Sequence, residues 1–224
     1  MKTFFIEARH KGKVELPDEV IGLLPKKIAL LTTVQFLGSL ADVKKQLEKK
    51  GKKVLLLKAE HTKYPGQLLG CNIKKFDDSD GQGESFDAFL DIGDGLFHPQ
   101  ALMLKNNKPV FIYNPFSKKH TRLEEKDVKL MKRKNESAKL KFLSSKEIGV
   151  LISTKPGQQQ IKKAYALEKK FPGKSFYFLL FDTIDFGELE NFPFIECFVN
   201  TACPRIAFDE AEKIRKPVIN IEEI

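Results

Sequence analysis

The chain has 224 residues, of which 42% are hydrophobic and 31% charged, and its net charge is +9 at pH 7. This composition describes a globular protein with room for one large domain or two small ones. Its apolar stretches are too short and too interrupted to span a membrane, and no signal segment opens the sequence, so we expect a cytoplasmic protein. Three cysteines are too few for a disulfide scaffold, which leaves metal binding, redox chemistry or simple burial.

Most of the positive charge comes from lysines in residues 44–53, 118–120 and 129–141. Such runs are typical of solvated helix faces, and docking to an acidic or RNA-rich partner is the weaker alternative. Most of the 19 phenylalanines lie inside apolar runs, where they indicate a core rather than a surface that stacks on bases. We therefore expect no direct nucleic-acid binding and no membrane partner.

Apolar strands alternate with helical patterns along the first half of the chain. Ser39 is predicted to cap a helix whose Leu40, Val43 and Leu47 form one apolar stripe before Gly51 ends it. A second, shorter helix is predicted from about Pro99. The expected strands occupy residues 26–34, 52–59, 86–93 and 108–115.

The same order of elements then restarts. A polar, lysine-rich stretch at 116–145 is predicted to contain a connecting helix, after which strand, helix and strand patterns follow at 147–157, 159–173 and 174–182. The triplet Lys-Pro-Val occurs in both halves, at 108–110 and 216–218. This self-similarity predicts a duplicated module.

We therefore predict an α/β fold of two similar modules, each a parallel four-stranded sheet flanked by helices. The expected domains are an N-terminal extension at 1–25, a first module with its connecting helix at 26–145, and a second module at 146–224. Right-handed crossovers place the strand-to-helix loops of such modules at one sheet edge, where a ligand between the modules could contact both sets of loops. The unusual residues expected at these edges are Thr32, Thr33, Gln35 and His98 in the first module, and Lys155, Gln158, Cys203 and Arg205 in the second.

Four motifs occur in order along the chain: "YPGQLLGCN" at 64–72, "GDGLFHP" at 93–99, "STKPGQ" at 153–158 and "FVNTACPRI" at 198–206. Together they resemble the diphthamide synthase family of archaea and eukaryotes. The resemblance covers nearly the whole chain and implies an enzyme that uses S-adenosylmethionine. It implies transfer of a 3-amino-3-carboxypropyl group, by a radical mechanism, to one histidine of translation elongation factor 2, the first step toward diphthamide.

In this family three related α/β domains each offer one cysteine to a four-iron four-sulfur cluster, and the remaining iron holds the methionine end of S-adenosylmethionine. By motif position the resemblance implies that Cys71 and Cys203 are cluster ligands. Thiolate is the ligand that iron–sulfur clusters require. Arg205 and Gln158 are expected to bind the carboxylate of the cofactor, since a guanidinium offers a planar fork to a carboxylate. No residue is assigned as a general acid or base.

One departure from the family pattern concerns the first cysteine, which belongs to a domain that would precede "LPKKIALLTT". Residues 1–25 contain no cysteine. The spare Cys197 lies in an apolar run, where a buried small hydrophobe is favoured over a ligand.

Three hypotheses follow from the missing cysteine. The first is a subunit of a homo- or hetero-oligomer in which another chain supplies it. The second is a minimal enzyme whose cluster uses two cysteines plus another ligand, or Cys197 after a rearrangement. The third is a cluster-free accessory module that binds elongation factor 2 through its basic face.

Overall fold

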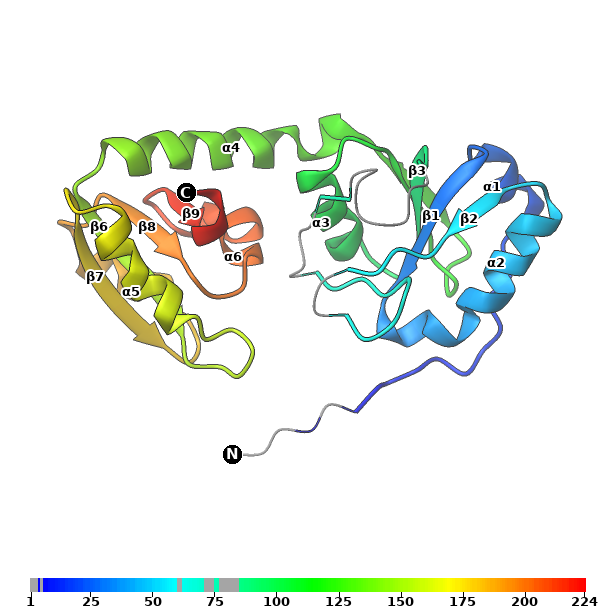
Figure 1. Ribbon diagram of the computed structural model, residues 1–224, viewed down its shortest axis with the longest axis horizontal. Coiled ribbons are helices and arrows are strands. Elements are labelled where there is room, and N and C mark those ends of the chain that lie inside the picture. The colour runs from blue at the N-terminus through cyan, green and yellow to red at the C-terminus, as the bar shows by residue number, and fades with distance from the viewer. Residues whose placement is uncertain (1–3, 5, 60–61, 71–74, 77–84) are drawn as a thin grey trace. The chain divides into compact units, whose positions relative to one another are not determined.

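The computed structural model describes residue 4 and residues 6–59, 62–70, 75–76 and 85–224. These residues form two compact units, Met1–Val128 and Lys129–Ile224. Each unit contains one sheet of mainly parallel strands with helices packed against it (Figure 1). The predicted α/β architecture of two parallel sheets flanked by helices is therefore confirmed.

The sheet of the first unit has the strand order β2-β1-β3-β4-β5. Its strands are β1 (Lys27–Thr32), β2 (Lys53–Leu55), β3 (Ala88–Ile92), β4 (Val110–Tyr113) and β5 (His120–Leu123). The first four strands are parallel, as predicted, but β5 is antiparallel to β4 and was not expected. A tight turn makes this hairpin possible, because Asn114 Oδ1 accepts hydrogen bonds from the backbone N–H groups of Phe116 and Ser117.

The helices of the first unit are α1 (Asp18–Leu23), η1 (Val34–Ser39), α2 (Leu40–Lys49) and α3 (Phe97–Lys105). Ser39 stands at the start of α2, but its side chain makes no capping hydrogen bond, so that prediction was wrong. The 3₁₀ helix η1 runs directly into α2 and gives Ser39 helical dihedral angles, whereas a capping residue usually has an extended backbone. Val14, Leu16 and Val20 in the N-terminal segment are buried in the core beside β1.

The sheet of the second unit is wholly parallel, in the order β7-β6-β8-β9. Its strands are β6 (Glu147–Ser153), β7 (Ser175–Phe181), β8 (Cys197–Asn200) and β9 (Val218–Asn220). The helices are α4 (Glu125–Ser144), which begins before the unit boundary, α5 (Ile161–Lys170) and α6 (Arg205–Asp209), with short 3₁₀ helices η2 (Gly187–Asn191), η3 (Ala211–Lys213) and η4 (Ile221–Glu223).

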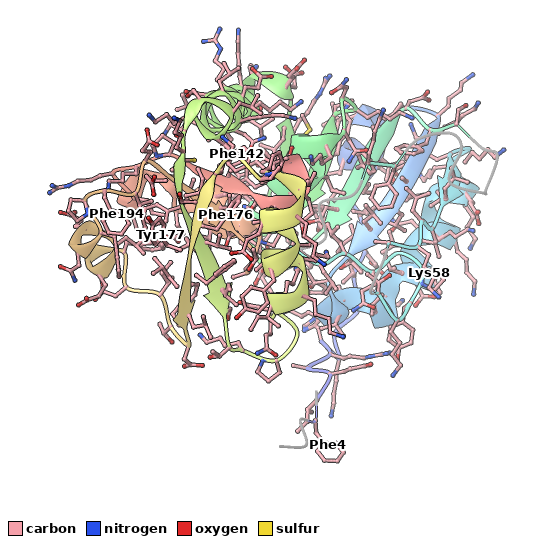
Figure 2. The ribbon with its side chains drawn as sticks, turned by 60° about the vertical axis from the view of Figure 1, so that its left-hand side comes forward. Phe4, Lys58, Phe142, Phe176, Tyr177 and Phe194 are labelled. Carbon is pink, nitrogen blue, oxygen red and sulfur yellow. The ribbon has the colours of Figure 1, made fainter. Side chains whose placement is uncertain are left out.

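Both faces of the second sheet are covered by apolar cores. On one face Phe142 of α4 packs with Leu167 of α5 and Val150 of β6, all of them buried. Figure 2 labels Phe142 and, beside it, Phe176 of β7, which packs against the same core. On the other face Leu189 of η2 packs with Phe198 of β8. In β6 and β8, burial on both faces explains why the strand sequences are continuous apolar runs rather than alternating ones.

The two sheets share one topology. In each, the first strand lies between the second and the third, and the fourth strand follows the third. The shared strand order supports the duplication that the sequence repeat predicted. Across the part of the chain that the structure describes, none of the helices combines the length and apolar character needed to cross a bilayer.

Candidate functional site

The carboxyl ends of β6 and β8 form a topological switch point. From β6 the chain passes through α5 to β7 on one side of the sheet, while β8 pairs with the other side of β6. The loops that follow these two strands therefore leave the sheet edge in opposite directions. Open α/β sheets bind their ligands at such a point. Gln158 and Cys203 lie in these two loops, and Arg205 begins the helix after the second of them.

Two buried asparagines hold the loop that follows β8. Asn200 Nδ2 donates to the carbonyl oxygen of Cys203 (2.9 Å) and to Oδ1 of Asn220 (2.7 Å). Asn200 Oδ1 accepts from the backbone N–H of Ala202 at 3.1 Å. Asn220 Nδ2 donates to the carbonyl oxygen of Pro204 at 3.0 Å. The backbone around the Cys203 thiol is thus tied to the ends of β8 and β9 by a connected network of buried amides.

Cys203 is half-buried and lies directly before α6. Its carbonyl oxygen accepts a second hydrogen bond, from the backbone N–H of Ile206 at 3.0 Å. On the β6 side, the buried Thr201 donates through Oγ1 to the carbonyl oxygen of Leu151 at 2.8 Å. The loop bearing the thiol is therefore fixed at both ends.

Arg205 is buried and makes an ion pair within α6. Its Nε donates to Asp209 Oδ2 at 2.7 Å. Burial raises the pKa of Asp209, and the positive charge of Arg205 opposes that rise. The ion pair fixes the position of the guanidinium. Binding of a cofactor carboxylate by Arg205 stays a prediction.

Gln158 closes a turn that follows β6. Its backbone N–H donates to the carbonyl oxygen of Lys155 at 3.1 Å. The central residues are Pro156 and Gly157, and Gly157 has φ +81°, which glycine adopts without strain and which type II turns require. The Gln158 side chain is half-buried, and its predicted contact with the cofactor stays a prediction.

Cys197 lies at the start of β8 and is fully buried in the apolar core with Ile148, Val199 and Phe142. Burial raises the pKa of its thiol to about 12. A thiol with so high a pKa stays protonated at neutral pH, whereas metal ligation needs the thiolate. The interpretation of Cys197 as a buried small hydrophobe is confirmed.

Cys71, the other predicted ligand, lies outside the described residues. The chain just before it is anchored at the carboxyl edge of the first sheet. Thr32 at the end of β1 donates its N–H to the Gly66 carbonyl oxygen and accepts from the Leu68 N–H, both at 2.8 Å. His98, at the start of α3, is half-buried and stacks edge to face on Phe97.

Sequence reasoning missed Asp91, which is buried near the end of β3, at the switch point of the first sheet. Its Oδ1 atom is buried and has no hydrogen-bond partner in the part of the chain that the structure describes. Burial, and secondarily the charge of Asp94, raises the pKa of Asp91 to about 7. A lone acid inside the apolar run "FLDIG" was the signal that could have identified it, since unpaired carboxyl groups are rarely buried.

The described residues contain no group of three or more histidine, cysteine or acidic side chains placed to hold a metal ion. They do supply one thiol, Cys203, on a loop held by hydrogen bonds at the carboxyl edge of the second sheet. Iron–sulfur clusters require thiolate donors. Cys203 therefore suits one position in a cluster ligand set, and Cys197 does not.

Comparison with known proteins shows to which family the chain belongs. The family model for the diphthamide synthesis protein matches residues 1–224. The chain belongs to this family. The resemblance drawn from the four motifs is thereby confirmed.

Two curated members show how far the similarity extends. The 2-(3-amino-3-carboxypropyl)histidine synthase of Pyrococcus horikoshii is 32% identical over 99% of this chain and 64% of its own length. Subunit 1 of the corresponding synthase of Caenorhabditis elegans is 31% identical over 87% of this chain and 48% of its own length. The chain thus spans less than two thirds of the length of either relative.

A solved structure of the family agrees with the fold. The crystal structure of Dph2 from Pyrococcus horikoshii with a 4Fe-4S cluster superposes with a TM-score of 0.75 at 30% sequence identity. The match covers 92% of this chain and 59% of that one. The family to which the chain belongs therefore includes a protein known to hold such a cluster.

Proposed function

We propose that this chain takes part in the first step of diphthamide biosynthesis. The reaction transfers the 3-amino-3-carboxypropyl group of S-adenosylmethionine to a histidine of translation elongation factor 2. Membership in the diphthamide synthesis family supports the assignment, and so does the name of the synthase from Pyrococcus horikoshii. The observation that carries it is the position of Cys203, half-buried on a braced loop at the switch point of the second sheet.

In this proposal the residues at the switch point bind the cluster and the cofactor. Cys203 supplies a thiolate to a four-iron four-sulfur cluster, and the Asn200–Asn220 pair holds its loop in place. Arg205, fixed by Asp209, and Gln158 bind the carboxylate of S-adenosylmethionine. When bound, the cluster supplies the electron that breaks the carbon–sulfur bond.

The other cysteine ligands of the cluster lie outside the switch point of the second sheet. Cys71 is the second cysteine of this chain that the proposal uses. A second polypeptide supplies the third, which makes the active form an oligomer. The designation of the Caenorhabditis elegans relative as subunit 1 is in keeping with such an assembly.

Anaerobic purification followed by iron, sulfide and absorbance measurements tests the proposal. The wild-type chain is expected to hold iron and sulfide, alone or with its partner, and Cys203→Ala to lose them. The matched control is Cys197→Ala, which removes a thiol only four positions from the start of the loop and is expected to keep the iron content. A colourless wild-type protein that cannot be reconstituted alone or with a partner would support a cluster-free accessory module instead.

A further inference from the structure

Two of the four sequence motifs meet at a contact to which the proposed function gives no role. Gly70 is the last described residue of "YPGQLLGCN", and Phe97 of "GDGLFHP" begins α3. A Cβ atom added to Gly70 would lie 1.9 Å from Cε1 and 2.6 Å from Cδ1 of Phe97. The φ angle of Gly70 is not positive, so only the ring excludes a larger residue. The edge of the Phe97 ring therefore packs directly on the Gly70 backbone.

The position of Phe97 is fixed by the helix that it begins. Residues 101–103 of α3 are buried, and in the first turn the N–H of Gln100 donates to the carbonyl oxygen of Leu96 at 2.9 Å. Phe97 itself is 45% exposed. The ring thus stands partly outside the core, on a rigid element, with one edge on Gly70.

The chain that leads to Gly70 is fixed by β1. Thr32 at the end of β1 forms a parallel bridge with Gln67, and Leu68 is buried. Gly70 is next held by the ring, and Cys71 follows it directly in the sequence. Because consecutive Cα atoms are about 3.8 Å apart, a contact that fixes Gly70 restricts where the next residue can lie.

The described residues of the first unit do not repeat, on the corresponding strand, the asparagine network that holds the loop of Cys203. Strand β3 carries Asp91 near its end, and Asp91 Oδ1 has no hydrogen-bond partner among the described residues. The residue beside it on β4 is Ile112, which has no polar side-chain atom. Another contact has to hold the chain before Cys71, and the ring edge on Gly70 lies directly beside it in the sequence.

We propose that Phe97 is a positioning residue whose ring holds the Gly70 backbone and thereby keeps Cys71 in place as a cluster ligand. The inference rests on the proposed function for the role of Cys71, whereas the contact between Phe97 and Gly70 does not depend on it. Phe97 takes no part in the chemistry. Loss of the ring, or a side chain at position 70 that displaces it, releases the chain just before the thiol.

The first test measures the alkylation rate of each thiol in the cluster-free full chain, by mass spectrometry of the cysteine peptides. Phe97→Ala is expected to raise the rate at Cys71 about fivefold, because lost apolar burial makes local opening easier. Cys203 belongs to the other compact unit and should keep its rate. Leu96→Ala is the matched control, since Leu96 is the adjacent residue and is 46% exposed. An unchanged rate at Cys71, or an equal rise at both thiols, would overturn the proposal.

A double-variant cycle tests whether the contact itself is responsible. Gly70→Ala should raise the rate at Cys71 as much as Phe97→Ala does, because the new Cβ displaces the ring. In the Phe97→Ala background this Cβ meets no ring, so the double variant should react no faster than Phe97→Ala alone. Gly95→Ala is the control for replacing a glycine, since a Cβ there meets nothing within 4 Å. Additive effects would contradict the proposal, because the two residues would then act through separate contacts.

Iron retention connects the contact with the proposed function. After anaerobic reconstitution, Phe97→Ala is expected to lose iron to a chelator about fivefold faster than the wild type, and Leu96→Ala at the wild-type rate. Equal loss from the wild type and Phe97→Ala would show that Phe97 does not position Cys71 for a cluster. A wild-type protein that binds no iron, alone or with a partner, would contradict the proposed function, and the alkylation rates would still decide whether Phe97 holds the chain before Cys71.

Discussion

The two sheets place different side chains at one equivalent position. Asp91 of β3 is in register with Leu31 of β1, and Asn200 of β8 is in register with Leu151 of β6. Both positions lie on the third strand, close to the switch point. Asn200 has hydrogen-bond partners for its amide oxygen and nitrogen, whereas Asp91 has a buried oxygen without one among the described residues. The duplicated fold thus differs at this position. In the second sheet Asn200 holds a loop by hydrogen bonds, and in the first sheet Asp91 has a buried carboxyl oxygen without a partner among the described residues.

The neighbouring strand explains the difference. In the second sheet the residue beside Asn200 is Asn220 of β9, whose oxygen accepts a hydrogen bond. In the first sheet the residue beside Asp91 is Ile112 of β4, which has no polar side-chain atom. A buried polar group without a partner lowers stability, so it is retained where it serves a function. Asp91 is therefore, beside Asn200, a second residue whose role can be tested by replacement.

The largest expected effect is on the pH dependence of stability, and it tests the Asp91 side of the comparison. The pKa of Asp91 is raised to about 7 from 3.8, so between these values the folded state binds more protons than the unfolded state. The contribution of Asp91 to stability is therefore fully present below about pH 4, decreases as pH rises and is lost above about pH 7, a change on the order of 4 kcal/mol in the free energy of unfolding. In Asp91→Asn this fall should be absent. Urea unfolding of the wild type and Asp91→Asn between pH 4 and pH 8 measures this pH dependence. If the free energy of unfolding changes equally with pH in both proteins, the pKa of Asp91 is not raised by folding.

Replacing Asn200 tests the other side of the comparison. Asn200→Ala removes the acceptor of the Ala202 N–H and the donor to Asn220 Oδ1, which should cost about 3 kcal/mol in the free energy of unfolding. The Cys203 thiol should react faster with an alkylating reagent because its loop is released. Asn191→Ala on η2 is the control, since Asn191 is exposed and its side-chain amide donates to the exposed Glu188. Equal thiol reactivity in wild type and Asn200→Ala would show that the asparagine does not position the loop.

The sequence predicted much of the architecture because the repeat and the apolar runs are local patterns. The thiol at Cys203 and the core position of Cys197 followed from a motif and from strand context. The Asn200–Asn220 network could not be predicted, because it depends on which strands are neighbours and in what register. Strand β5 was missed for a related reason: its polar residues gain their strand conformation from pairing with β4 rather than from their own pattern.

The smallest expected effect concerns a threonine hydrogen bond that occurs in both sheets. Its donor is on the first strand in one sheet and follows the third strand in the other. Thr32 of β1 donates through Oγ1 to the carbonyl oxygen of Ile92 at 2.6 Å, while Thr201 after β8 donates to that of Leu151 at 2.8 Å. Each bond ties the first strand of its sheet to the third, and both hydroxyl groups are buried. Replacement of either threonine by valine keeps the shape of the side chain and should cost about 1 kcal/mol.

Amide hydrogen exchange can show in which sheet each replacement lowers the stability. Thr32→Val should speed amide exchange in β1 and β3 and leave β6 and β8 unchanged, and Thr201→Val should do the reverse. The reason is that the threonines belong to separate compact units, and local opening follows the unit in which a bond is lost. The double variant should then show the sum of the two effects, because distant sites without shared partners are additive. Faster exchange in both sheets after a single replacement would mean that the duplicated modules open together rather than one at a time.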